Sequence, residues 1–158
     1  MRLTKFSDYS LRILMLSASK ADVRITIEEA AETFGISRAH VKKVVLRLSQ
    51  AGFLTGVRGR KGGFTLAMPP EQINLGALLR VTEPDFGLAE CFLTGNQCLI
   101  TQPCRLPPIL NKAVNAFLAV FDAYTVADIM IAPADFEALV GDLQPLRGPR
   151  LKPAPDMA

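Results

Sequence analysis

The sequence predicts a mainly α-helical protein with a small β-wing: a winged helix-turn-helix domain followed by a long dimerisation helix. Three observations lead to this fold class. Two short amphipathic segments flank a glycine turn, a basic glycine-rich hairpin comes directly after them, and apolar residues recur at heptad spacing beyond residue 105.

The amino-terminal half begins with an amphipathic pattern that predicts a helix over residues 6–19. Thr26 and Glu29 then form a capping box, in which the Thr26 hydroxyl accepts the Glu29 N–H and the Glu29 carboxylate reaches back to Thr26. This box predicts a short helix over residues 27–34, and Gly35 suits the tight turn that follows it.

A third helix is predicted from Ser37, which can cap it, to about Gln50. The second helix of a helix-turn-helix enters the major groove of DNA. Strands over residues 53–57 and 63–67 enclose a basic glycine-rich loop, which is typical of a wing that meets phosphates or the narrow minor groove. We therefore expect double-stranded DNA to be bound by Ser37, Arg38, His40, Lys42 and Lys43 of the helix and by Arg58, Arg60 and Lys61 of the wing.

The second half predicts a short connecting helix over residues 73–82 and a long helix over 106–124. In the long helix, apolar residues recur at steps of four and three from Leu106 to Tyr124, and no helix of similar length could cover this seam, so we expect a homodimer. The predicted parts are a DNA-binding domain (1–70), a connecting helix and cysteine loop (71–105), a dimerisation helix and C-terminal helical segment (106–142), and a disordered tail (143–158).

Composition narrows the function. Residues 1–65 hold 12 of the 18 Lys and Arg residues but only 5 of the 15 Asp and Glu residues, so the amino-terminal part is suited to a polyanion. His40 is the one histidine, which argues against a zinc hydrolase or a histidine-based enzyme. The first residues contain no secretory apolar stretch, and no run of about 18 apolar residues occurs, so we expect a cytoplasmic protein without a membrane span.

The three cysteines, Cys91, Cys98 and Cys104, are separated by six and five residues in a turn-rich segment. They could be small buried hydrophobic residues, because cysteine often is. Thiolates in an irregular loop can instead wrap a metal centre. Zinc would require a fourth Cys or His nearby, and no histidine follows His40, whereas an iron–sulfur cluster could be held by three cysteines and an oxygen ligand. A redox disulfide is the alternative to a metal centre. A thiol oxidoreductase is a further possibility, and its only support is Arg105 beside Cys104.

Taken together, these features resemble the iron–sulfur winged-helix transcriptional repressors of the IscR/RirA/NsrR family. The resemblance covers about residues 1–130, and its specific pieces are MRLTKFSDYSLR, VRGRKGGFTLAMP and CLITQPCRL with the later KAVNAFL and DAYTVADI. The last pieces look most like the NsrR branch, whereas VTEPDFGLAECF looks rather like RirA. Pro107 stands where IscR-type members have a histidine, which argues against their ligand set.

The resemblance implies a repressor that senses nitric oxide and releases operator DNA when its iron–sulfur cluster is nitrosylated or lost. It implies that Cys91, Cys98, Cys104 and, from the other subunit, Asp8 hold the cluster, with 4Fe–4S favoured over 2Fe–2S. Asp8 could equally be a first-turn carboxylate that stabilises a helix. An iron-responsive, RirA-like regulator and a cluster-free thiol-redox repressor are the alternatives.

Overall fold

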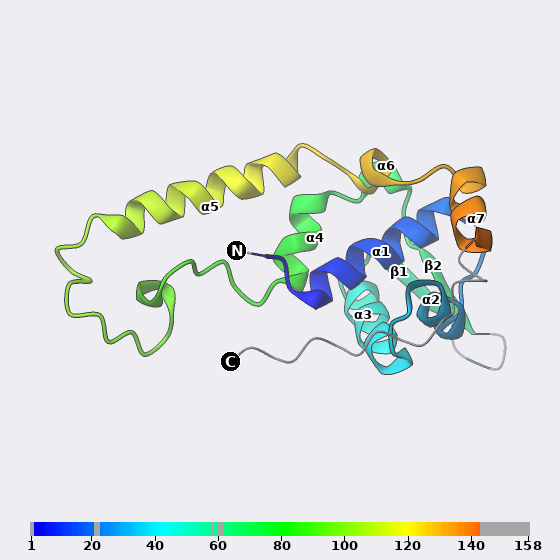
Figure 1. The fold of residues 1–158 in the computed structure, drawn as a ribbon, viewed down its shortest axis with the longest axis horizontal. Coiled ribbons are helices and arrows are strands. Elements are labelled where there is room, and N and C mark those ends of the chain that lie inside the picture. Colours follow the sequence, from blue (N-terminus) through cyan, green and yellow to red (C-terminus); the bar gives the residue numbers. More distant parts are fainter. Residues whose placement is uncertain (1, 21–22, 58, 60–61, 143–158) are drawn as a thin grey trace.

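The computed structural model describes residues 2–20, 23–57, 59 and 62–142 and shows a helical body from which a long arm projects (Figure 1). The elements in chain order are α1 (Lys5–Ser19), α2 (Ile27–Phe34), α3 (Arg38–Gln50), β1 (Leu54–Val57), β2 (Gly63–Leu66), the 3-10 turn η1 (Pro70–Gln72), α4 (Leu75–Thr82), the 3-10 turn η2 (Glu90–Phe92), α5 (Leu106–Asp122), α6 (Val126–Ile129) and α7 (Pro133–Asp142). The protein is therefore mainly helical with one two-stranded sheet, as the sequence predicts.

Helix α1 forms the centre of the body. Its first turn is capped by Thr4, whose hydroxyl accepts the Ser7 N–H at 3.2 Å. Its apolar stripe is fully buried at Ile13, Leu14 and Leu16, against α2, α3, α4 and β2. Burial of side chains of this size typically stabilises a protein by about 1.5–3 kcal/mol each, so α1 holds the surrounding elements together.

The helix-turn-helix is formed by α2 and α3, as predicted. Thr26 accepts the Glu29 N–H at 3.1 Å, but the Glu29 carboxylate pairs with the Lys20 ammonium instead of returning to Thr26, so half of the predicted capping box is replaced by an ion pair. Gly35 ends α2 in the left-handed conformation with φ 64°, which a side chain would disfavour. Ser37 caps α3 by accepting the His40 N–H at 3.3 Å.

The wing is an antiparallel hairpin in which Leu54 pairs with Leu66 and Val57 pairs with Gly63. Its inner strand is fastened to the body because Ile25 and Phe64, both fully buried, exchange two backbone hydrogen bonds of 3.0 and 2.8 Å. Each strand is one residue shorter than predicted. The three predicted wing cations, Arg58, Arg60 and Lys61, lie outside the described residues.

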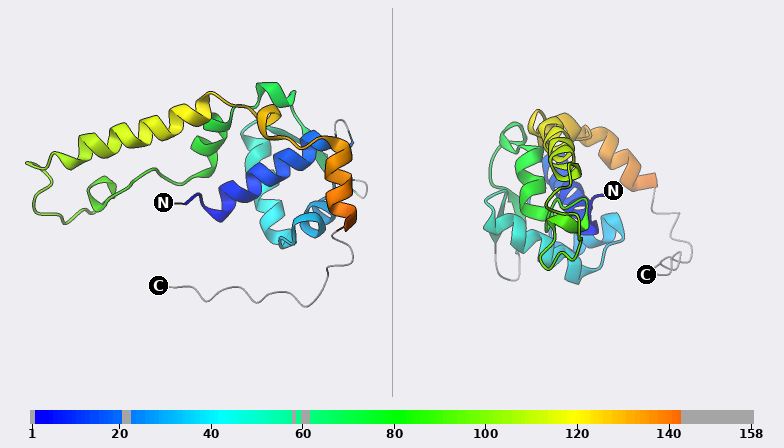
Figure 2. Two further views of the ribbon diagram at one scale, coloured as in Figure 1. Left: turned by 45° about the horizontal axis from the view of Figure 1, so that its top comes forward. Right: turned by 90° about the vertical axis from the view of Figure 1, so that its left-hand side faces the viewer.

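We define the arm as residues 84–122, which comprise the cysteine segment (84–105) and α5. The two parts run beside each other away from the body and rejoin it at α4 (Figure 2). Helix α5 ends two residues before the predicted limit. Along its seam, Leu106, Val120 and Tyr124 are exposed, whereas Phe117 and Phe121 are half-buried and pack on each other with ring centroids 5.0 Å apart.

The last helices return to the body. A capping box between Thr125 and Asp128 opens α6, and the Thr125 N–H and hydroxyl, both donating to the carboxylate, lower the pKa of Asp128. Helix α7 then lies on α2 at the end of the molecule opposite the arm, with Phe136 edge-on to Phe34 at 6.4 Å. The predicted disordered tail, 143–158, lies outside the described residues. Within the residues that are described, no helix has the length and apolarity needed to cross a membrane.

Candidate functional site

The amino-terminal half of α3 presents a polar and basic surface to solvent. Ser37, His40, Lys42 and Lys43 are all exposed, because the buried positions of α3 fall on its opposite face at Val41, Val44 and Leu48. The Ser37 hydroxyl lies 3.0 Å from His40 Nδ1, so the cap and the imidazole form one small hydrogen-bonded unit. This arrangement can place one hydroxyl, one imidazole and two ammonium groups against a DNA groove.

Arg38 differs from the other predicted DNA-binding residues of α3. Its guanidinium forms an ion pair of 2.8 Å with Glu28 of α2, although both side chains are largely exposed. An exposed ion pair is worth at most about 1 kcal/mol, so a phosphate could compete for Arg38. Arg38 is therefore exposed on the same side of α3 as Lys42 but is paired with a carboxylate of α2.

The first turns of α1 adjoin this surface. The Tyr9 ring lies 6.1 Å from the His40 ring, centroid to centroid, so α1 contacts the α3 residue predicted to face DNA. Its neighbour Asp8 accepts from Arg12 at 3.0 and 2.8 Å in an i, i+4 ion pair with both side chains nearly half exposed. Within one chain, Asp8 is thus a first-turn carboxylate paired with Arg12 and remains open to solvent.

All three cysteines carry free thiols, with Cys98 exposed and Cys91 and Cys104 half-buried. Short local hydrogen bonds shape the segment: the Cys98 N–H donates to the Asn96 side chain at 2.9 Å, and the Leu106 N–H donates to Cys104 Sγ at 3.4 Å. The described part of the chain brings no three His, Cys, Asp or Glu side chains close enough together to hold a metal ion. The thiols share one segment, and Asp8 is not grouped with them.

The donor set nevertheless fits an iron–sulfur cluster. Three accessible thiols on one irregular segment supply the soft ligands that such clusters require, and a backbone N–H already donates to one sulfur, as is common around cluster thiolates. The segment has no fourth cysteine, so it offers three thiol ligands and no more.

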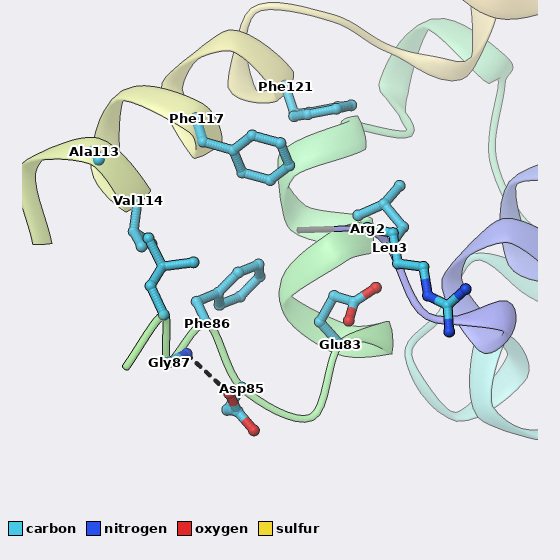
Figure 3. Close-up of a pocket in the computed structure, with 11 residues that line it drawn as sticks. Arg2, Leu3, Glu83, Asp85, Phe86, Gly87, Ala113, Val114, Phe117 and Phe121 are labelled. Atoms are coloured by element: carbon cyan, nitrogen blue, oxygen red, sulfur yellow. Dashed lines mark hydrogen bonds between the residues drawn. The ribbon is translucent and has the colours of Figure 1, made fainter. Parts of the chain in front are cut away.

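A pocket of about 300 Å³ lies between the start of the cysteine segment and α5 (Figure 3). Its walls are mainly apolar, with Phe86 facing Phe117 and Phe121 across the space, and the carboxylates of Glu83 and Asp85 stand at its edge. Residues 86–88 therefore rest against α5 without filling the space between them.

The other end of the arm is fastened to α4 by charge and hydrogen bonds. Arg80 binds both carboxylate oxygens of Asp122 at 2.5 and 2.8 Å, and this hydrogen bonding, helped by the opposite charges, lowers the pKa of Asp122 and raises that of Arg80. The Asn74 side chain adds bonds to the Asp122 and Tyr124 carbonyls at 2.8 and 3.2 Å. The end of α5 is thus fixed to both ends of α4.

Residues 3–132 match the profile of the Rrf2 family, which is described as an iron-dependent transcriptional regulator. The chain belongs to the Rrf2 family. It is 44% identical over 142 residues to the HTH-type transcriptional regulator NsrR of Bacillus subtilis, an alignment that covers 89% of this chain and 97% of the relative. This is an NsrR-like Rrf2 transcriptional regulator, not an enzyme.

Solved structures agree on the Rrf2 fold. The oxidized form of Staphylococcus aureus CymR superposes with a TM-score of 0.64 at 24% identity, covering 80% of this chain and 93% of CymR. IscR of T. potens superposes with a TM-score of 0.63 at 20% identity, covering 96% of this chain and 94% of IscR. At these identities the likeness establishes the winged-helix architecture alone.

Two residues that hold α4 in place were not anticipated from the sequence. Arg47 lies on α3 but donates to the Val81 carbonyl of α4, and Glu83 accepts from Thr4 of α1. Both pairs are separated by more than 30 positions along the chain, so no local spacing rule could have found them.

Proposed function

We propose that this Rrf2 protein is an iron–sulfur repressor that senses nitric oxide and releases operator DNA when its cluster is nitrosylated or lost. The observation that supports this most is the 44% identity to a regulator named NsrR over nearly the full length of both chains. The three free thiols on the arm and the exposed basic surface of α3 supply the two sites that such a regulator needs.

For the sensing site we propose Cys91, Cys98 and Cys104 of one subunit and Asp8 of the other, with 4Fe–4S favoured over 2Fe–2S. The bound cluster would supply iron that reacts with nitric oxide. Asp8 would leave its ion pair with Arg12 to act as ligand, and Arg12 would then be released toward another anion. A carboxylate is a weak donor beside thiolates, so this ligand would be the one exchanged most readily.

For the DNA site we propose the exposed face of α3 together with the wing. Ser37, His40, Lys42 and Lys43 would enter the major groove, and Arg38 would exchange Glu28 for a phosphate. Arg58, Arg60 and Lys61 of the wing would follow the adjacent minor groove. Double-stranded operator DNA would be read by two such units about 34 Å apart, which is one turn of the duplex.

The two units would come from a homodimer formed through α5. Leu106, Ile109 and Val120 expose apolar surface along this helix, Tyr124 does so just beyond its end, and Ile109 is 62% exposed. Exposed apolar side chains at helical spacing are typical of an interface between copies of a chain. The proposed ligand set requires that this dimer place Asp8 of one subunit beside the cysteine segment of the other.

The proposal is tested by comparing the operator affinity of three forms: the cluster-loaded protein, the apo-protein and Cys98→Ala. Coupling of about 2–3 kcal/mol would weaken the affinity of the last two by some 30- to 150-fold. Gln97→Ala is the matched control, because it changes the neighbouring residue and keeps every thiol. If all forms bound the operator equally tightly, the sensing proposal would be wrong.

An iron-responsive regulator is the second candidate, and the family's description as iron-dependent favours it. Here the signal would be loss of the cluster under iron limitation. Treating the cluster-loaded protein with nitric oxide or with an iron chelator distinguishes the two functions. A cluster that does not react with nitric oxide but is removed by the chelator, with release of DNA, supports iron sensing.

A further inference from the structure

The end of helix α3 is tied to the last turn of α4. Arg47 donates from Nε to the Val81 carbonyl of α4 at 3.2 Å, and Arg38, at the other end of α3, pairs with Glu28 of α2. Helix α3 therefore carries its predicted DNA-binding residues at one end and a hydrogen bond to α4 near the other. Because a helix moves as a rigid unit, a shift of α4 at Val81 would tilt the DNA-binding end.

The same turn of α4 is tied to the start of α1. The Glu83 carboxylate accepts the Thr4 N–H at 2.9 Å and the Thr4 hydroxyl at 3.2 Å. The Ser7 and Thr82 hydroxyls form a buried hydrogen bond of 2.8 Å. The last turn of α4 thus contacts both α1 and α3. The cysteine segment follows it directly in the chain, beginning at residue 84.

The arm also returns to α4 at its other end. Asp122 of α5 binds Arg80, so the cysteine segment and α5 form a closed loop whose two ends are both fixed to this one short helix (Figure 1). The open pocket beside residues 86–88 leaves room for the loop to repack against α5. A rearrangement of the cysteine segment therefore reaches the body chiefly through α4.

We propose that Arg47 is a positioning residue that transmits the state of the arm to the recognition helix through the Val81 carbonyl. This inference rests on the proposed function in one respect, because it takes residues 84–105 as the segment whose state changes. Arg47 is not assigned to DNA: its Nε is engaged with α4. Coupling is reciprocal, so DNA bound to α3 must also alter the arm.

The reciprocal effect can be measured without any cluster. Amide hydrogen exchange of the full-length apo-protein would be followed over residues 84–93, with and without a saturating duplex of about 30 base pairs selected by the protein from a random-sequence pool. In the wild type, DNA should change exchange in this segment. In Arg47→Met, which keeps the apolar stem but removes the donors, the change should disappear although DNA is still bound.

Three further variants make the result specific. Arg47→Lys keeps a charged donor and should restore the effect, whereas Lys112→Met removes one exposed cation from α5 and should leave it intact. Glu83→Ala, which cuts the tie to Thr4 and leaves Arg47 in place, should reduce the change only in part. In the cluster-loaded protein, Arg47→Met should lower the affinity ratio between loaded and apo forms by about fivefold, the value of one hydrogen bond.

Failure of this inference differs from failure of the proposed function. No exchange change in the wild type, or an undiminished change in Arg47→Met, would overturn the role of Arg47 whether or not a cluster is present. A protein that never takes up iron would overturn the cluster alone, since the exchange experiment uses apo-protein throughout.

Discussion

Gly63 lies where the wing approaches the backbone of the body closely. A methyl group at Gly63 would lie 2.5 Å from the Ile25 carbonyl oxygen and 2.7 Å from Arg24 Cγ. The oxygen belongs to the backbone and cannot rotate aside, so β2 would have to move by roughly 1 Å to reach an ordinary contact. That movement would break the two hydrogen bonds between Ile25 and Phe64.

We therefore expect Gly63→Ala to lower the free energy of unfolding by about 2 kcal/mol, at about 1 kcal/mol for each backbone bond. For a chain of this size the melting temperature should fall by about 4–8 °C. Displacement of the wing should also make DNA binding less dependent on salt, with a slope smaller by about 0.9 for each phosphate that the wing no longer neutralises. Circular dichroism and fluorescence anisotropy measure the two effects.

Gly56→Ala is the matched control on the partner strand. Its methyl group would meet only Ser49 Oγ at 3.8 Å, an ordinary contact, and alanine suits a strand better than glycine. Stability should change by no more than about 0.5 kcal/mol. If Gly63→Ala melted and bound DNA as Gly56→Ala does, the Ile25–Phe64 connection would not fix the wing.

Three further predictions concern the recognition helix and the arm. Ser37→Ala should lower stability by about 1 kcal/mol through loss of the α3 cap, and Ser37→Thr should not, as judged from urea unfolding. Lys43→Ala should lower the salt slope of DNA binding by about 0.9, whereas Lys112→Ala on α5 should leave it unchanged; equal slopes would remove Lys43 from the DNA surface. Hydrogen bonding to Arg80 lowers the pKa of Asp122 below its ordinary value of about 3.9. The ion pair therefore stabilises the fold at pH values above about 3.9, and this stabilisation is lost as the pH falls through the lowered pKa. Urea midpoints of Asp122→Asn should therefore depend less on pH than those of the wild type between about pH 5 and pH 2, and identical profiles would contradict the assignment.

The amino-terminal half was predictable from sequence because its signals are local. A threonine or serine cap lies within three residues of the N–H it accepts, as at Thr26 and Ser37, and the turn glycine must follow the helix it ends, as at Gly35. Hydrophobic spacing then fixed which face of each helix is buried. The bounds of α2 and α3 follow from these rules alone.

The connections that position the arm were not predictable in this way. Arg47 and Val81 are 34 residues apart, and Thr4 and Glu83 are 79 apart, so their meeting depends on how α1, α3 and α4 pack. The docking of Phe136 on Phe34 is equally non-local. At Glu29 a non-local contact overrides a local rule. The capping box predicts that its carboxylate accepts the backbone N–H of Thr26, but the carboxylate pairs with Lys20 instead.

The cysteine segment was predicted only in part from the sequence. Its composition predicts a ligand-binding loop, and the structure places all three thiols there as free groups. The proposed fourth ligand is Asp8 of a second subunit. Spacing rules within one chain do not predict a contact between two copies of that chain.

The most direct test of cluster-based sensing is anaerobic purification with a visible absorption spectrum, iron and sulfide analysis, and a nitric oxide titration followed by operator binding. We predict a brown dimer whose absorption spectrum changes at a few nitric oxide molecules per cluster. Its affinity for the operator should fall by at least about 30-fold, the lower bound of the expected coupling. A colourless protein that takes up no iron and still binds the operator would contradict the claim that this regulator senses through a cluster.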